Sequence, residues 1–339
     1  MAVTRDNAAI FPVTGAFATT PPASGNFIPT VWSAKLNAKF YASTLFNEIS
    51  NTNWQGDISG MGDKVIIHTA PTITVSNYVA GGSLSYQVPT PSTLEMVIDK
   101  AKAFAFQIND VLDYQAKPNL LDMFSADAGE QMKITIDSNV LYNTIFQAAA
   151  ANQGASAGAK SGSYALGTAA APVAVNATSG DVNNILTKIL QMASVLDEQN
   201  VPEGERFLLL DPATRALLMN TNLAQAQFMG DSSSMVRNGK IGTIDRFTTY
   251  VTNQLPYANA GGTSWISGYG DESSIVAATN AAKRRVIVAG HKSAITFASQ
   301  ITKMETVRNP NDFGDFIRSL NVYGFKVVKP EALTVAIIA

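Results

Sequence analysis

Residues 62–79 read GDKVIIHTAPTITVSNYV, and the second half of this stretch decides which fold we expect. From Thr72 onward apolar and polar residues alternate with a period of two, which predicts a β-strand with one buried and one solvated face. One face carries Ile73, Val75 and Val79, and the other carries Thr72, Thr74, Ser76 and Tyr78.

A turn and a return limb follow this strand. Ala80-Gly81-Gly82-Ser83 supplies the turn, because glycine adopts positive φ without a Cβ clash. Limbs of about 15 residues reach roughly 50 Å at ~3.3 Å per residue. A two-stranded ribbon is marginally stable alone in water, so we expect its apolar face to lie on another surface, most simply on a second copy of the chain. The returning alternation runs through Leu94, Met96 and Ile98, and then Phe104, Phe106 and Ile108.

The composition narrows the class of protein. A length of 339 residues fits one large or two medium domains, and 46% hydrophobic residues suffice for a substantial core. Only 15% of residues are charged, below the usual ~25%, which predicts a surface that partners cover. The net charge of −2 argues against a dedicated nucleic-acid binder.

Several chemistries are not expected. The chain has no cysteine and only two histidines, His68 and His291, so disulfides are excluded and a zinc site is disfavoured. We expect no metal and no cofactor. The first residues lack a basic start followed by an apolar run, and no apolar run approaches the roughly 18 residues of a membrane span, so neither a secretory signal nor a membrane contact is expected.

Helical spacing predicts several amphipathic helices. One opens at Pro29 and ends in the cluster at 51–53, and a longer one runs from Pro118 to about Ala150. A third is expected to be capped by Asp181 and to stop at 200–202, and a shorter one follows Asp211-Pro212. The stripe of the longer helix comprises Leu121, Phe124, Ala128, Met132, Ile136, Val140 and Ile145.

The remaining segments are expected to be strands or irregular. Strand and helix alternate after residue 181, which predicts a compact α/β layer. Residues 151–180 hold Ala, Gly, Ser and Thr with one charge, Lys160, and this predicts a flexible insertion. Residues 1–28 predict an extended arm, with a disordered tail as the alternative. The expected strands lie at 207–210, 247–251, 285–289, 295–297, 315–325 and 333–338.

Two stretches match or nearly match catalytic sequence motifs but lack the flanking elements that those motifs require. Ser156 lies in a G-x-S-x-G pattern, but no strand precedes it and more glycine follows, so the nucleophile-elbow geometry is not expected. A near P-loop around Lys160 lacks its second glycine and a leading strand. We therefore expect no catalytic residue and no enzyme. The basic run Lys283-Arg284-Arg285 favours a solvent or intersubunit role over DNA contact.

The order of elements resembles the tailed-phage major capsid protein, an α+β fold called the Johnson fold, which also occurs in herpesvirus capsid floors and encapsulin shells. Four stretches carry the resemblance. They are Gly62-Asp63-Lys64-Val65, AKAFAFQINDVLDYQAKPNLLDMF at 101–124, ERFLLLDPATRALLM at 205–219 and VYGFKVVKPEALTVAII at 322–338.

The resemblance implies a role for each part of the chain and a set of partners. It implies an icosahedral head shell of pentamers and hexamers around double-stranded DNA, assembled in the bacterial host cytoplasm, with a separate scaffolding protein, a portal and, in some shells, a cement protein. The parts are an N-arm (1–28), an N-terminal helix (29–59), an extended loop (60–108), a spine helix with peripheral domain (109–180), an axial domain (181–260) and closing, mainly peripheral strands (261–339).

Residue-level expectations complete this interpretation. No lysine occurs between Lys64 and Lys100, which disfavours the covalent cross-link that some family members form near the loop tip. The rival functions are an encapsulin-like shell, a serine hydrolase using Ser156 and a surface adhesin, the last disfavoured by the missing signal. The expected intersubunit contacts are Ile73, Val75, Tyr78, Gly81, Gly82, Tyr86, Lys283, Arg284 and Arg285.

Overall fold

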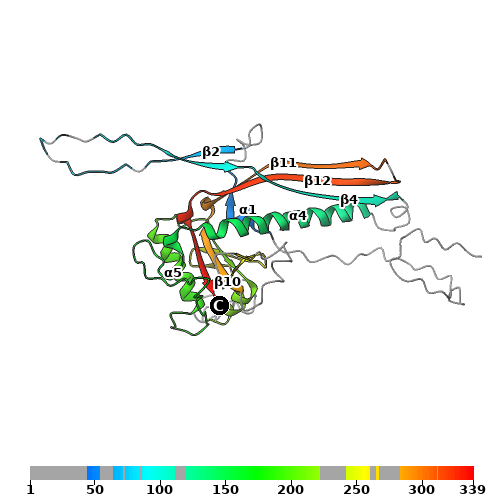
Figure 1. The fold of residues 1–339 in the computed structure, drawn as a ribbon. Helices are drawn as coiled ribbons and strands as arrows, with labels where there is room; N and C mark the ends of the chain where they lie inside the picture. Colours follow the sequence, from blue (N-terminus) through cyan, green and yellow to red (C-terminus); the bar gives the residue numbers. More distant parts are fainter. Residues whose placement is uncertain are drawn as a thin grey trace, which may run out of the picture.

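The structure is a computed structural model, and it places a thin arm and a long sheet on top of a compact α/β layer (Figure 1). The sheet and the arm extend in opposite directions from the region above α5 and β10. The residues that it describes are 44–53, 64–71, 73–78, 80–81, 83, 86–110, 120–221, 242–259, 265–266, 283–310 and 312–339. The expected N-arm and most of the expected first helix lie outside these residues.

The long sheet has the strand order β1-β11-β12-β4. Its strands are β1 (Ser50–Asn51), β11 (Ile295–Arg308), β12 (Gly314–Val327) and β4 (Lys100–Asn109). The helix α4 (Leu120–Thr144) runs beneath one face (Figure 1). Burial alternates along β12, so that Ile317 and Tyr323 are buried while Phe316 and Leu320 are exposed on the other face. The expected strands at 295–297 and 315–325 are confirmed and are longer than predicted.

The α/β layer is built on a seven-stranded sheet. Six strands follow the order β6-β7-β5-β10-β8-β9, and β13 also pairs with β10. The helices α5 (Ile185–Glu198) and α6 (Pro212–Met219) pack beside it. The strands are β5 (Arg206–Leu210), β6 (Thr243–Ile244), β7 (Phe247–Val251), β8 (Tyr257–Asn259), β9 (Trp265–Ile266), β10 (Lys283–His291) and β13 (Leu333–Ile338).

Several predictions for this layer are confirmed. Every residue of β5 is buried, and Asp211 caps α6 by accepting a hydrogen bond from the Thr214 amide. The cap of α5 is different from the expected one, because Asn184 accepts from the Leu186 amide while the Asp181 carboxylate accepts from the Asn183 amide, before the helix begins. The strand β13 pairs with β10, so this part of the chain closes the α/β sheet and not the long sheet.

The prediction of a flexible insertion at residues 151–180 is wrong. Ala157 and Leu166 are fully buried, and main-chain bonds tie the segment to β13: the Val173 amide donates to the Ile337 carbonyl (3.0 Å) and the Ile337 amide to the Leu166 carbonyl (2.8 Å). Gly167, at φ +80°, lies so close that an added Cβ would fall 2.3 Å from the Ile337 oxygen. The small residues therefore permit close packing of backbones.

The ends of the helices differ modestly from prediction. The helix α1 (Phe46–Ile49) ends where β1 begins, before the predicted polar cluster. The helix α4 ends at Thr144, whereas the prediction placed its end at about Ala150. Two 3-10 turns, η1 (Ile145–Gln147) and η2 (Ala150–Asn152), follow it. Two further 3-10 turns, η5 (Lys292–Ala294) and η6 (Pro330–Ala332), join the two sheets.

Candidate assembly surfaces

The arm begins as a paired hairpin. The strands β2 (Lys64–Thr69) and β3 (Ser92–Val97) are antiparallel, with Lys64 opposite Val97 and Thr69 opposite Ser92. The chain then leaves the hairpin, and β4 pairs with β12. The prediction that the two-stranded ribbon continues to Ile108 is therefore wrong for its last part. The alternation at 104–108 does form a strand, as predicted, but periodicity alone does not indicate which strand pairs with it.

The base of the arm is fixed to the long sheet. Ile67, Met96 and Ile98 are buried in one cluster with Ala298 of β11. Gly324 of β12 lies directly below the crossing chain, because an added Cβ would be 2.5 Å from the Val97 oxygen. The expectation that the whole ribbon leaves its apolar face open is therefore too broad, because this end of the ribbon is covered by its own subunit.

In contrast, nearly all described residues of the outer arm, which spans residues 70–91, are solvent-exposed. Val75 is 97% exposed and Tyr86 is 91% exposed, and Ile73, Tyr78 and Val88 are also largely exposed. No main-chain to main-chain hydrogen bond joins its described residues. Gly81, at φ +83°, makes the turn as predicted, while Gly82 lies outside the described residues. An apolar, β-prone segment without intrachain cover is the kind of surface that a partner buries.

The face of the long sheet opposite α4 is a second partly apolar surface. Cross-strand rows set Val307 beside Phe316, and Leu320 beside Ala103. Val307, Phe316 and Leu320 keep between 37% and 43% of their surface exposed. A shallow depression is lined here by Ala103, Ala105, Leu320, Lys303, Glu305 and Arg318. The neighbouring Lys303 and Arg318 bind Glu305 and hold the pKa of its carboxyl below the ordinary value.

Polar contacts order the far end of the long sheet. Arg308 donates from Nη1 to Asp110 at 2.9 Å and to Asp315 at 3.3 Å, and these contacts bridge β11, β12 and the end of β4. Phe313, in the turn between β11 and β12, is 74% exposed. The sheet therefore ends in a charged cluster and an exposed aromatic ring, a third place where a partner has apolar surface to bury.

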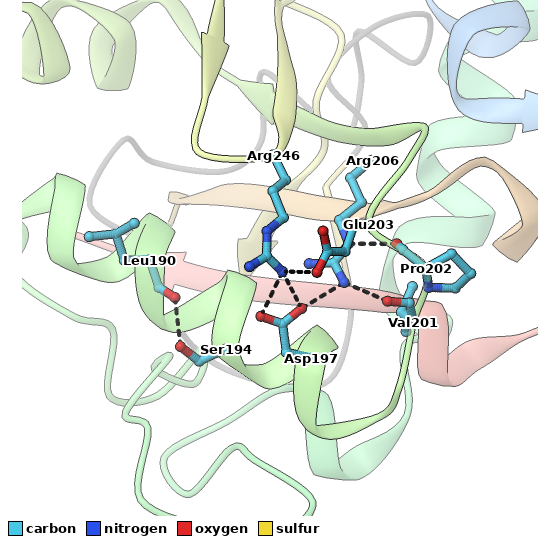
Figure 2. Close-up of polar contacts among 8 residues, drawn as sticks. All are labelled: Leu190, Ser194, Asp197, Val201, Pro202, Glu203, Arg206 and Arg246. Carbon is cyan, nitrogen blue, oxygen red and sulfur yellow. Dashed lines mark hydrogen bonds and ion pairs between the residues drawn. The ribbon is translucent and has the colours of Figure 1, made fainter. Parts of the chain in front are cut away.

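A buried arginine organises the α/β layer. Figure 2 shows Asp197 between the guanidinium groups of Arg206 and Arg246. The Arg206 side chain is fully buried and donates from Nη2 to Asp197 Oδ1 at 2.7 Å and from Nε to the Pro202 carbonyl at 2.8 Å. Arg246, which is partly exposed, reaches Asp197 at 3.2 Å and Glu203 at 3.1 Å. These contacts connect α5, β5 and the loop before β7.

Comparison with known proteins identifies the family to which this chain belongs. The family model described as phage capsid protein matches residues 91–336.

This chain belongs to the phage capsid protein family.

Solved capsid structures share its fold. A chain from Mycobacterium phage Che8 is 24% identical, with a TM-score of 0.67, 92% of this chain covered and 98% of that one. The capsid of Cyanophage P-SCSP1u is 17% identical, with a TM-score of 0.67 and coverage of 98% and 99%. The mature capsid of bacteriophage PhiM1 is 14% identical, with a TM-score of 0.64 and coverage of 91% of each chain.

Family and fold together make this a structural major capsid protein of a phage head, as predicted. The comparison with curated proteins finds no significant match. The rival encapsulin and hydrolase functions are not favoured. Its place is the virion.

The basic run of the capsid protein lies apart from the arm, at the start of β10. Arg284 and Arg285 are half-buried, and the side chain of Lys283 lies outside the described residues. Arg285 donates from Nη2 to the Ala339 carbonyl at 2.6 Å, within the same subunit. The predicted contact residues therefore form two separate groups, and one member of the basic run already has an intrachain partner.

The tempting motifs have structural explanations. Ser156 is exposed in a turn between isolated bridges, without the strand that a nucleophile elbow requires. In the near P-loop, the amides of Lys160 and Ser161 donate to the Glu198 carboxylate at 2.8 and 3.1 Å, so this anion site is occupied by the chain itself. His291 contacts Ser293 through Nδ1, and burial lowers the pKa of its imidazole.

Within the part of the chain that the structure describes, no cluster of three or more His, Cys, Asp or Glu side chains has an arrangement suited to a metal ion. No helix among these residues has the length and apolar character needed to cross a bilayer.

Sequence reasoning missed three residues that make structural contacts near these surfaces or in the spine. Gln87 bridges the limbs of the outer arm, Gly324 permits the arm to cross the sheet, and Asp137 holds α1 on the spine helix. The sequence holds a signal for the Gln87 contact. Pro71 lies close to Thr74, and Pro89 and Pro91 lie close to Gln87, and these prolines mark the place where a regular strand ladder must stop. Gly324 and Asp137 have no comparable sequence signal, because their importance comes from contacts with residues that are distant in the sequence.

Proposed function

We propose that this capsid protein builds an icosahedral shell by laying its outer arm over the long sheet of a neighbouring subunit. The observation that supports this most directly is the exposed apolar arm, with Val75 97% exposed, on a base that its own subunit fixes rigidly. A fixed base holds the exposed tip away from the described residues of its own body, where a neighbouring subunit can cover it.

The receiving surface is the face of the long sheet opposite α4. It offers apolar side chains, Val307, Phe316 and Leu320, around the small residues Ala103 and Ala105. The extended arm and this sheet point in opposite directions (Figure 1), so within the described part of one subunit the arm does not reach this face. The contact is therefore heterologous, the type that closes into rings.

We assign the remaining parts on the same basis. Residues 181–260 form the axial domain around five-fold and six-fold axes, and residues 151–180, β10 and β13 join it because they share its sheet and core. The long sheet with α4 is the peripheral domain, and residues 1–28 are the N-arm. The basic run at 283–285 serves as a secondary intersubunit contact.

The partners follow from a shell of this type. The pentamers and hexamers enclose double-stranded DNA, which a subunit of net charge −2 contacts weakly and without base recognition. A separate scaffolding protein guides assembly in the host cytoplasm, a portal occupies one vertex, and a cement protein is an optional addition. The protein has no catalytic role.

The test is Val75→Asp, with Val75→Ile as the matched control. Val75→Asp places a charge where the arm must become dry, so we expect shells or rings to be lost in negative-stain images and in sedimentation. Circular dichroism and the melting temperature should stay unchanged, because Val75 contacts no core. Val75→Ile should assemble normally. Normal shells from Val75→Asp would refute the role of the arm.

A further inference from the structure

The outer arm contains a contact that resembles a strand pair but is made by a side chain. The Thr74 amide donates to Gln87 Oε1 at 3.1 Å, and Gln87 Nε2 donates to the Thr74 carbonyl at 3.0 Å and also contacts Thr74 Oγ1. Two residues that face each other in an antiparallel ladder exchange the same two bonds through their peptide groups. Here the side-chain amide of Gln87 takes the place of the opposing peptide.

The position of this contact follows the register of the hairpin. Thr69 lies opposite Ser92 at the end of the β2–β3 ladder. Continuing that register residue by residue places Thr74 opposite Gln87. The two limbs have therefore kept their alignment beyond the ladder, although the backbones are separated by the length of a glutamine side chain.

Prolines explain why the backbone ladder stops where it does. In this register three prolines lie between the Thr69–Ser92 pair and the Thr74–Gln87 pair. Pro71 is on one limb, and Pro89 and Pro91 are on the other. Proline cannot donate to a ladder and is confined to strand edges and irregular positions. The prolines thus open the ribbon, and Gln87 restores alignment on the far side of the opening.

We propose that Gln87 is the positioning residue of the arm: its amide holds the two limbs in register but apart, so that each limb presents an unpaired strand to a second copy of the chain. Apart from Thr74, whose amide and carbonyl bind Gln87, the limb with Ile73 and Val75 and the limb with Tyr86 and Val88 then keep the main-chain groups of these residues free for the neighbour. This inference rests on the proposed role of the arm in shell assembly.

The first experiment compares assembly of Gln87→Ala with Asn77→Ala, an exposed amide on the same arm that has no bond to another described residue. Gln87→Ala should slow assembly about tenfold, because two hydrogen bonds that pre-order the arm are lost. Asn77→Ala should assemble at the wild-type rate. The melting temperature should not change in either variant, since residue 87 is exposed and outside every buried cluster.

Gln87→Glu separates the two bonds. The carboxylate still accepts from the Thr74 amide but cannot donate to the Thr74 carbonyl, so assembly should fall between wild type and Gln87→Ala. Hydrogen exchange on the unassembled subunit gives an independent readout: the Thr74 amide should be protected relative to Ser76, and this protection should vanish in Gln87→Ala. Equal exchange of Thr74 in both proteins would overturn the proposal.

Rescue tests positioning directly. The chain has no cysteine, so Thr74→Cys combined with Gln87→Cys reacts with a short bis-maleimide at these sites alone, and the bridged protein should regain assembly. Failure of the two proposals is distinguishable. If Val75→Asp blocks assembly while Gln87→Ala assembles at the wild-type rate, the role of Gln87 is wrong and the role of the arm stands. If Val75→Asp assembles, the role of the arm is itself wrong.

Discussion

Replacing Asp137 by asparagine should remove a large part of the pH dependence of subunit stability. Asp137 lies on α4 and is fully buried. Its Oδ1 accepts from the amides of Leu45 at 3.1 Å and Phe46 at 2.8 Å and so caps α1, while Oδ2 has no partner among the described residues. Burial raises the pKa of this carboxyl from 3.8 to about 6, and the two amide bonds offset only part of that rise.

The magnitude and sign follow from linkage. A pKa of about 6 in the folded chain against 3.8 in the unfolded chain corresponds to about 3 kcal/mol. The folded chain binds the proton more tightly, so this stabilisation is complete below pH 3.8 and is lost as the pH rises through about 6. Above that pH the wild type carries a buried charge, whereas Asp137→Asn does not and can still accept from both amides.

The assay is urea unfolding of unassembled wild-type and Asp137→Asn subunits between pH 4 and pH 8. The free energy of unfolding of Asp137→Asn minus that of wild type should increase by about 2.5 kcal/mol across this range, because at pH 4 the carboxyl of the unfolded chain is already partly ionised. Taking the difference cancels the titration of every other group. Parallel profiles for the two proteins would refute the reasoning, because they would mean that the carboxyl titrates as in the unfolded chain.

Two contacts yield further predictions, each with an internal control. Arg206→Ala should cost about 3 kcal/mol of unfolding free energy, because it removes the buried donor that binds Asp197 and the Val201 and Pro202 carbonyls, whereas Arg246→Ala, at the exposed side of the same cluster (Figure 2), should cost about 1 kcal/mol or less; equal costs in urea unfolding would contradict this. Gly324→Ala should destabilise by about 1–3 kcal/mol and raise hydrogen exchange in β3, because its Cβ would meet the Val97 oxygen. Gly129→Ala, where a Cβ on α4 meets nothing, should instead stabilise by about 0.5–1 kcal/mol; the opposite order of melting temperatures would refute the packing argument.

Local sequence signals predicted the elements that local chemistry determines. The strand β13 has the predicted bounds 333–338, because a mostly apolar run rich in β-branched residues follows Pro330-Glu331. The helix α6 begins at Pro212 for the reason expected, a side-chain cap from Asp211 followed by proline at the first helical position. Asp181 and Asn184 are both good caps, and only the structure shows that the later one begins α5.

The errors arise where main-chain bonding or tertiary contact decides. Residues 151–180 have little side-chain apolar surface, yet backbone bonds to β13 order them. The alternation at 104–108 fixes a strand and its two faces, but the partner, β12, lies more than two hundred residues away in the chain. The apolar candidates of the assembly surface were predictable because exposure follows from their place on an unpaired arm. Gln87 and Gly324 matter through what lies opposite them, and one sequence does not show that.

The packing of the arm base limits how a subunit can adapt to its neighbours in a shell. The arm leaves the long sheet at the crossing over Gly324, where the base is buried and the backbones lie in close contact, so we expect the arm base and the long sheet to keep a fixed relative orientation. Among the described residues of the outer arm beyond the prolines, hydrogen bonds between the two limbs come from Gln87. A change in the angle between neighbours must therefore be taken up beyond this opening, in limbs that keep their register while they bend. Many such contacts, each weak, then close a shell through multiplicity and without a strong individual bond.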